Sequence, residues 1–325
     1  MLKTLEQTIE LINEGKLLQI AGAKELLRKL PKGNWIGGTQ EYFVTDDFGG
    51  ETSNEKLFVA QFSLDEVKNY KIKEYDEKSI KNMPKDSYSN GFSIVILPVG
   101  SPVFLEYARN AVDYEDIFFK NIVGWGAGYN LAGTDTTALV INGQTGNILE
   151  KEAIVLHMER DENINISILN IFEPDENSPV ITFKEETTNI KNAFINGEEV
   201  EFVKYLKENE INIMLPMIGD YSGQSINVPF NPGQNLDAET IALGAPAFPL
   251  IEYRFAKPIK SYEEAFANKS KELHRKDIIF SVNCALNYLY GSLEGKKVEN
   301  LNGPAAFGEI AYKLLTQTVV FVERI

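Results

Sequence analysis

The chain has 325 residues, of which 43% are hydrophobic and 11% aromatic, so it can bury a large core and is not a disordered sequence. Its 47 acidic and 32 basic side chains give a formal charge of −15, which repels nucleic acid and anionic membrane surfaces. A single cysteine and two histidines exclude an internal disulfide and a Cys/His zinc site, and we expect neither a metal nor a cofactor.

The first 16 residues predict an amphipathic helix, because apolar side chains recur at positions i, i+4 and i+7. Thr4 and Gln7 have the spacing of a capping box at its start. Charges throughout this segment are not typical of a signal peptide, and the longest apolar run, 92–99, is far shorter than the roughly 20 residues of a membrane helix. We therefore expect a cytoplasmic protein that does not enter a membrane.

Helices and strands alternate irregularly in the first part of the chain. Helices are predicted at 23–30 and 103–122, the second with Ser101 at the N-cap and Pro102 in the first turn. Strands are predicted at 16–22, 34–45, 55–64, 92–99, 136–150, 152–160 and 163–172. The turn formers of 46–54 favour a hairpin between the strands on either side of them.

The segment EPDENSP at 173–179 combines two prolines and three acids with no large apolar residue, and it predicts a domain boundary. Beyond it, helices are predicted at 198–209, 261–276 and 284–295, and strands at 179–186, 210–219, 239–258, 277–283, 305–312 and 317–325. We predict an α+β protein with domains at 1–172 and 173–325, built from mixed, largely antiparallel sheets with flanking helices.

The two predicted domains also contain similar segments. GGTQEYF at 37–43 and AAFGEIA at 305–311 place Glu41 and Glu309 in the same slot, each followed by a turn and an apolar strand. The pattern favours two related halves.

The glycine cluster GWGAGYN does not fit a dinucleotide-binding turn, because Tyr129 occupies the place of the third glycine in G-x-G-x-x-G. One interpretation is a tight crossing where this backbone passes close to another segment, with Trp125 covering apolar surface. The other is that Trp125 and Tyr129 form the wall of a small-molecule pocket.

Cys284 lies between a predicted strand and a predicted helix, where helix amides would stabilise a thiolate. This position suggests a Cys- or carboxylate-dependent hydrolase, which requires a base within reach of the thiol. His157, on a predicted strand, and His274, in a charged helix, are the two histidines that could serve. The alternative is that Cys284 is a small buried hydrophobic residue.

The part of the chain from residue 180 to the C-terminus resembles the C-terminal part of the FIST family, named for F-box and intracellular signal transduction proteins. The resemblance is carried by the turn at Asn196, by IIFSVNCA, and by AAFGEIAY followed by QTVVFVE. Gly308, Glu309, Ile310, Gln317 and Thr318 match the family pattern in order. The first part resembles the family more faintly through NWIGGTQEYF, in which Gln40 replaces a glycine, and the Gly-Arg pair common after the family's cysteine is missing.

The resemblance implies an intracellular sensory protein that binds a small, amino-acid-like ligand and signals through a separate partner. Glu309 would accept from a ligand ammonium, and backbone amides at the glycines would approach a polar ligand group. The expected ligand-binding residues are Gly38, Thr39, Glu41, Trp125, Tyr129, Asn283, Cys284, Gly308 and Glu309. A hydrolase and a structural scaffold with an apolar surface patch remain as alternatives.

Overall fold

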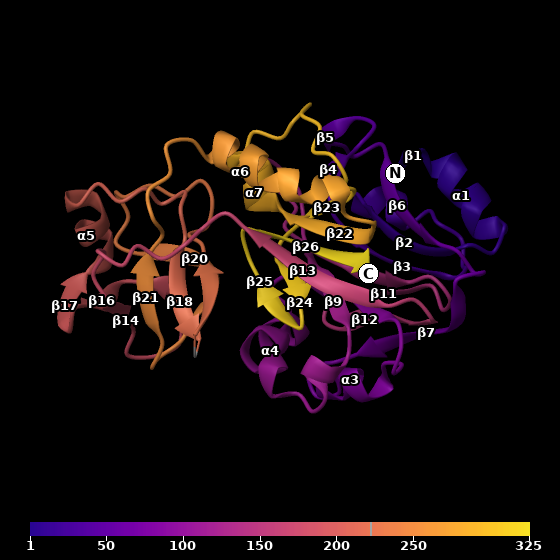
Figure 1. The fold of residues 1–325 in the computed structure, drawn as a ribbon, viewed down its shortest axis with the longest axis horizontal. Coiled ribbons are helices and arrows are strands. Elements are labelled where there is room, and N and C mark those ends of the chain that lie inside the picture. The colour runs from indigo at the N-terminus through magenta and orange to yellow at the C-terminus, as the bar shows by residue number, and fades with distance from the viewer. Residues whose placement is uncertain (222) are drawn as a thin grey trace.

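The computed structural model describes residues 1–325 with the exception of Ser222, and it consists of a large body and a smaller lobe (Figure 1). The body contains three six-stranded sheets, and both termini lie in it. The lobe, residues 173–257, is an insertion: the chain enters and leaves it side by side, where Lys257 N donates to Glu173 O. The mixture of helices with largely antiparallel sheets confirms the predicted α+β class.

The three sheets of the body share one arrangement of strands. The first has the order β1 (Leu2–Lys3), β6 (Leu57–Phe62), β2 (Leu17–Gly22), β3 (Trp35–Thr39), β10 (Val140–Asn142), β11 (Asn147–Leu149). The second has the order β7 (Val67–Tyr75), β12 (Ala153–Arg160), β8 (Phe92–Pro98), β9 (Ile122–Ala127), β24 (Glu309–Ala311), β25 (Lys313–Leu315). The third has the order β13 (Ile164–Asn170), β26 (Thr318–Arg324), β22 (Ile278–Cys284), β23 (Gly303–Ala306), β4 (Tyr42–Thr45), β5 (Gly49–Thr52).

Each sheet has one parallel pair at its centre, and a short helix connects the two strands of that pair. The pairs are β2–β3, β8–β9 and β22–β23, and the connecting helices are α2 (Lys24–Leu27), α4 (Pro102–Asn110) and α7 (Ala285–Tyr290). An antiparallel strand lies on one side of each pair and a hairpin on the other. The body is therefore a threefold structural repeat, with units at β1–β6, β7–β12 and β13–β26.

The hairpin of each unit belongs to the sheet of another unit. Hairpin β4–β5 extends the third sheet, β10–β11 the first, and β24–β25 the second. This cyclic exchange corrects the predicted division at residues 172 and 173, because strands from 278–324 pair with strands from both earlier units. The repeat also occurs three times rather than in two halves. The boundary at 173 is instead the start of the insertion lobe.

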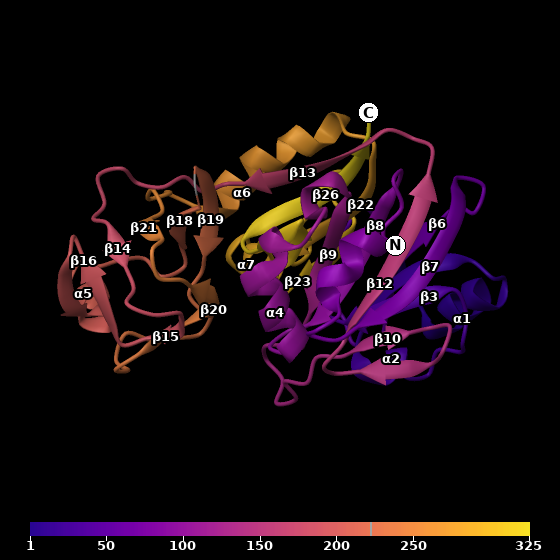
Figure 2. The same ribbon diagram turned by 90° about the horizontal axis from the view of Figure 1, so that it is seen from below.

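The inner faces of the three sheets pack on one another to form a common core. Ile36 and Phe58 come from the first sheet, Trp125 and Leu156 from the second, and Val320 from the third. Helices cover the outer faces: α1 (Leu5–Asn13) with α2, α3 (Met83–Asp86) with α4, and α6 (Tyr262–Ser270) with α7 (Figures 1 and 2). Burial of apolar surface on both faces of each sheet explains the continuous apolar runs of the central strands.

The insertion lobe has its own sheet and its own apolar core, which includes Phe202, Met217 and Tyr253. One sheet has the order β17 (Glu198–Glu201), β16 (Asn192–Ile195), β14 (Ile181–Thr182), β21 (Glu252–Phe255), β18 (Met217–Tyr221), β19 (Gln224–Val228). A separate pair is formed by β15 (Thr187–Ile190) and β20 (Ile241–Ala247), and the one helix described there is α5 (Phe202–Glu208).

The predicted helix starts are confirmed where a capping side chain carried the prediction. Thr4 and Gln7 form the capping box of α1, and Ser101 Oγ accepts from Phe104 N at the start of α4. The hairpin expected between 34–45 and 55–64 is wrong. The loop between them contains β5, which pairs with β4, while β6 pairs with β2. The long helix predicted over 103–122 ends at Asn110 and continues as short 3₁₀ turns.

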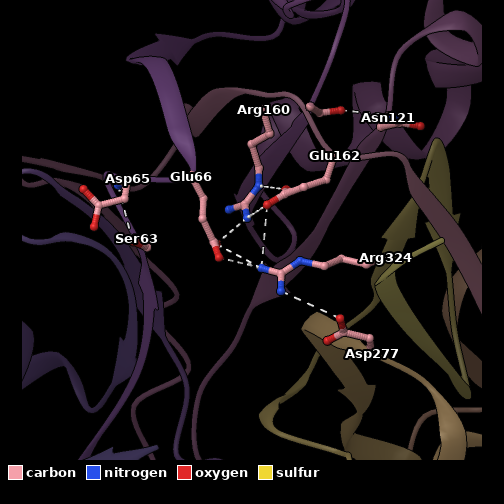
Figure 3. Close-up of polar contacts among 9 residues, drawn as sticks. Ser63, Asp65, Glu66, Asn121, Arg160, Glu162, Asp277 and Arg324 are labelled. Carbon is pink, nitrogen blue, oxygen red and sulfur yellow. Dashed lines mark hydrogen bonds and ion pairs between the residues drawn. The ribbon is translucent and has the colours of Figure 1, made fainter.

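Ion pairs join the second unit to the third at the amino ends of the parallel pairs (Figure 3). Arg160, at the end of β12, has a side chain only 2% exposed, and its guanidinium lies 2.6 Å from Glu66 and 2.7 Å from Glu162. Arg324, at the end of β26, lies 3.0 Å from Glu66 and 3.7 Å from Asp277. Glu66 lies between β6 and β7, so the cluster connects the link between the first two units to the ends of β12 and β26.

Candidate functional site

The carboxyl ends of the parallel pairs, opposite the ion-pair cluster, carry the cavities of interest. A cavity of about 450 Å³, called here the Cys284 cavity, lies between the ends of β8, β22 and β23 and the insertion lobe. Residues from the body that line it include Cys284, Phe307 and Gly308, and the lobe contributes Pro229 and Leu243. Ligand sites of sheets with parallel strands commonly lie outside the carboxyl ends of the strands. The position and the largely apolar lining therefore fit a small-molecule site.

Cys284 and Glu309 form a buried pair at the base of this cavity. Cys284 is 3% exposed, and its thiol is close enough to the Glu309 carboxyl for each group to affect the pKa of the other. Glu309 Oε2 accepts from Thr318 N at 3.0 Å and from Thr318 Oγ1 at 2.7 Å. Burial raises the pKa of Glu309 to about 8, and the Thr318 hydrogen bonds offset only part of this effect. The carboxyl is therefore mainly neutral at pH 7.

This neutral carboxyl does not fit the expected contact with a ligand ammonium. Glu309 is fully buried and does not line the cavity. Its Oε1 has no hydrogen-bond partner in the part of the chain that the structure describes. Glu309 is thus placed beneath the cavity floor, where it positions Thr318 and the Cys284 thiol.

Asn283 also lies beneath the floor, in a network of buried amides. Asn283 Oδ1 accepts from Cys284 N at 2.9 Å and from Asn287 Nδ2 at 3.0 Å. Tyr262 Oη donates to Asn287 Oδ1 at 2.7 Å, and Gln317 Nε2 donates to Tyr262 Oη at 3.2 Å. Asn283 Nδ2 and Gln317 Oε1 have no partner among the described residues. Buried polar atoms are rarely left unpaired, so this network has capacity for further hydrogen bonds.

The other predicted turn lines a different, more polar pocket of about 270 Å³, called here the Gln40 pocket. Thr39 and Glu41 line it, with Gln40 between them. Gln40 Oε1 accepts from Glu41 N at 2.8 Å, while its Nε2 is buried without a partner among the described residues. Gly38 does not reach this pocket, because it packs against Trp125 in the core. The structure therefore places the two predicted turns at separate pockets rather than at one site.

The glycine cluster is a tight crossing, as one of the two interpretations predicted. A Cβ at Gly124 would lie 1.9 Å from Val95 O, and one at Gly128 would lie 2.1 Å from the Phe307 ring. Trp125 is fully buried in the core and lines neither pocket, so its predicted role as a pocket wall is wrong. Tyr129 lines both pockets, whereas Gly128 and Asn130 of the cluster line the Gln40 pocket.

The arrangement around Cys284 does not provide an activated nucleophile. Burial raises the pKa of the thiol well above its usual value, so the protonated form dominates at neutral pH. His157 lies on β12, hydrogen-bonded to Tyr75 Oη at 3.0 Å and Ser93 Oγ at 2.8 Å. His274 is half-exposed next to Glu299. Neither histidine lines the Cys284 cavity.

Several residues of these sites gave no recognisable motif in the sequence. Asn287 and Tyr262 are brought together only by the packing of α6 on α7. Lys313 interrupts the apolar run of β24 and β25, and it is 8% exposed at the edge of a third cavity. The only sign of Lys313 in the sequence was a charged residue within an apolar strand pattern.

Neither a metal-ligand cluster nor a membrane-spanning helix occurs among the described residues, 1–221 and 223–325. They contain no group of three or more His, Cys, Asp or Glu side chains that could hold a metal ion. No helix among them combines the length and the apolar character needed to cross a bilayer.

Comparison with known proteins gives a family but no activity. A search of the curated proteins found no match. A family model matches residues 3–324, which is nearly the whole chain, including the insertion lobe and all three units of the body. The chain therefore belongs to the family described as "Family of unknown function (DUF6976)".

Proposed function

We propose that this protein binds a small molecule in the Cys284 cavity and acts as a sensory protein. The observation that carries the proposal is the position of this 450 Å³ cavity, between the carboxyl ends of the strands and a lobe inserted next to them. The lining is mainly apolar, with Cys284, Tyr129 and Thr316 as the polar side chains from the body. This composition suits a ligand with an apolar body and few polar groups.

Binding is favoured over hydrolysis by the state of the buried pair. Both the Cys284 thiol and the Glu309 carboxyl carry their protons at neutral pH, so the pair offers hydrogen-bond donors rather than a nucleophile. An amino-acid-like ligand, a cytoplasmic location and a separate signalling partner belong to the proposal through the resemblance to the FIST family. The formal charge of −15 argues against nucleic acid as that partner.

A thermal-shift screen of metabolites, with amino acids and neutral apolar compounds first, tests the proposal. A ligand at a hundred times its dissociation constant adds about 2.7 kcal/mol to the free energy of unfolding. Gly244, from the lobe, lines this cavity but not the cavity next to Lys313. A Cβ at Gly244 would meet no described atom closer than 3.1 Å. Gly244→Leu should fold and abolish the shift.

The matched control for this blocking variant is Lys313→Met, which changes the neighbouring cavity alone. It should leave the shift by a ligand of the Cys284 cavity intact. The proposal is wrong if no compound shifts the wild-type protein, or if Gly244→Leu responds as the wild type does.

A further inference from the structure

A second cavity lies between the body and the insertion lobe, beside the Cys284 cavity. It has a volume of about 430 Å³ and is formed by α4 and β25 on one side and by β18, β19 and the end of β20 on the other. Aromatic and aliphatic side chains provide most of its walls, among them Tyr107, Phe118, Tyr221, Ile226 and Phe248. We call it the Lys313 cavity.

Lys313, the first residue of β25, is the ionisable group that distinguishes this cavity. The residue is 8% exposed, and its ammonium lies 5.9 Å from the centre of the Tyr221 ring. Its one hydrogen-bond acceptor among the described residues is Gln224 Oε1, at 2.6 Å, and none of their ion pairs includes it. Burial lowers the pKa of Lys313 to about 8, with no carboxylate of the described residues to offset the loss of water. A buried cation without a counter-ion is costly to the fold.

The remaining charges around the cavity do not supply that counter-ion. No Asp or Glu of the described residues lines it, although the chain has 47 acidic side chains. Arg109 lies at its edge and is paired with Glu186 at 2.7 Å. The lining therefore attracts anions within a protein whose net charge is negative.

Three other polar side chains of the lining already have hydrogen-bond partners in the protein. Asn227 Nδ2 donates to Thr316 O at 3.0 Å, and Thr316 Oγ1 donates to Asn227 O at 2.8 Å. Tyr107 Oη donates to Tyr312 O at 2.8 Å. An ammonium has three hydrogens, so Lys313 retains capacity to donate after its bond to Gln224. It is therefore a cation with donors to spare on a mainly apolar wall.

We propose that the Lys313 cavity binds a small organic acid, with its carboxylate at the Lys313 ammonium and an aromatic or branched aliphatic body against the apolar walls. A single buried cation matches one carboxylate better than a phosphate, which carries more charge and needs more donors. Tyr221 and Gln224 belong to the lobe and Lys313 to the body, so the bound acid contacts both parts. This site rests on other residues than the Cys284 cavity and is independent of the function proposed for it.

The experiment is isothermal titration of the full-length protein at pH 7 with phenylacetate, 3-phenylpropionate and 4-methylpentanoate. Each acid is paired with its neutral amide, and sulfate at equal ionic strength serves as an inorganic anion. We expect the acids to bind and the amides and sulfate to bind at least tenfold more weakly. The amides lose the charge-assisted hydrogen bond to the ammonium, and sulfate has no apolar body to bury against the walls. Affinity for the acids should also fall above pH 8, as Lys313 loses its proton.

The test variant is Lys313→Met, which keeps the length of the side chain and removes its charge. It should reduce affinity for the acids at least tenfold. Lys191→Met is the matched control, because Lys191 lies in the lobe but outside the cavity, with a side chain that is 63% exposed. Equal binding of acid and amide, undiminished binding to Lys313→Met, or no binding of any of the three acids at millimolar concentration would overturn the proposal.

Discussion

Replacing Glu309 with Gln should change how the stability of the protein depends on pH. The carboxyl is fully buried, and burial raises its pKa from an ordinary 4.5 to about 8. Because the folded-state value lies above the unfolded one, the folded state holds the proton more tightly, and stability falls as pH rises between the two values. The amide introduced by Glu309→Gln would keep an oxygen for the Thr318 hydrogen bonds but would not titrate.

The magnitude follows from the two pKa values. Each pH unit between them removes about 1.4 kcal/mol from the free energy of unfolding. Between pH 5 and pH 7.5 the wild type should therefore lose about 3 kcal/mol more than Glu309→Gln does. At pH 7.5 the variant should be the more stable protein, because it no longer has to bury a carboxylate or hold a proton against the solution.

Urea unfolding at a series of pH values measures this difference, with the fluorescence of the buried Trp35 and Trp125 as the signal. Glu41→Gln is the matched control, since Glu41 lies where β3 passes into β4 but is only partly buried and hydrogen-bonded to Asn130. It should follow the wild type to within about 1 kcal/mol. Parallel pH profiles for the wild type and Glu309→Gln would refute the assignment of a neutral, buried carboxyl.

Three further predictions concern the body and its cysteine. His157 is buried, and burial lowers its pKa to about 3, so stability should fall as pH drops below 6.5; His157→Gln should lose about 2 kcal/mol less between pH 6.5 and pH 4.5 in urea titrations. Arg160→Ala should cost about 2 kcal/mol in the same assay, against less than about 1 for the more exposed Arg324→Ala, and equal costs would contradict a special role for the buried guanidinium. Cys284 should react with a thiol reagent orders of magnitude more slowly in the native protein than in urea, and rapid native labelling would restore the hydrolase alternative.

Local signals in the sequence predicted where helices begin, but they did not predict which strands pair with one another. Thr4 with Gln7, and Ser101 with Pro102, act within one helical turn, and both helix starts are where these residues predict them. The partner of a strand depends on contacts far along the chain. β4 pairs with β23, which lies almost at the other end of the sequence, and nothing in either segment specifies that contact.

The threefold repeat was hidden for a related reason. The insertion lobe separates β13 from β22, so the third unit is interrupted where the first two are continuous. The similarity of 37–43 to 305–311 reflects a real correspondence, since both segments lead from a parallel pair into an exchanged hairpin. The glycine cluster occupies the corresponding junction of the second unit. Because its glycines pack closely against Phe307, larger side chains do not fit there, and the sequence similarity is not visible.

The candidate site could be predicted only in part, because neighbouring residues of one motif face different sides of a strand. Cys284 and Gly308 line a cavity, whereas Glu309 and Asn283, neighbours of these residues in sequence, lie beneath its floor. Adjacent side chains of a strand point to opposite faces of the sheet. A motif of consecutive residues therefore contains some residues that line the cavity and others that lie beneath it.

The insertion lobe adds walls to a cavity at one of three similar strand ends. The ends of the parallel pairs are equivalent in the architecture of the body, yet the Gln40 pocket at the first unit is bounded by body residues alone. At the third unit the lobe adds Pro229, Leu243 and Pro246, and the same kind of strand end becomes the wall of a larger and more apolar cavity. Because the lobe also supplies Tyr221 and Gln224 around Lys313, a ligand in either cavity would stabilise the lobe against the body. Ligand binding and the position of the lobe would then be linked, as the proposed sensory function requires.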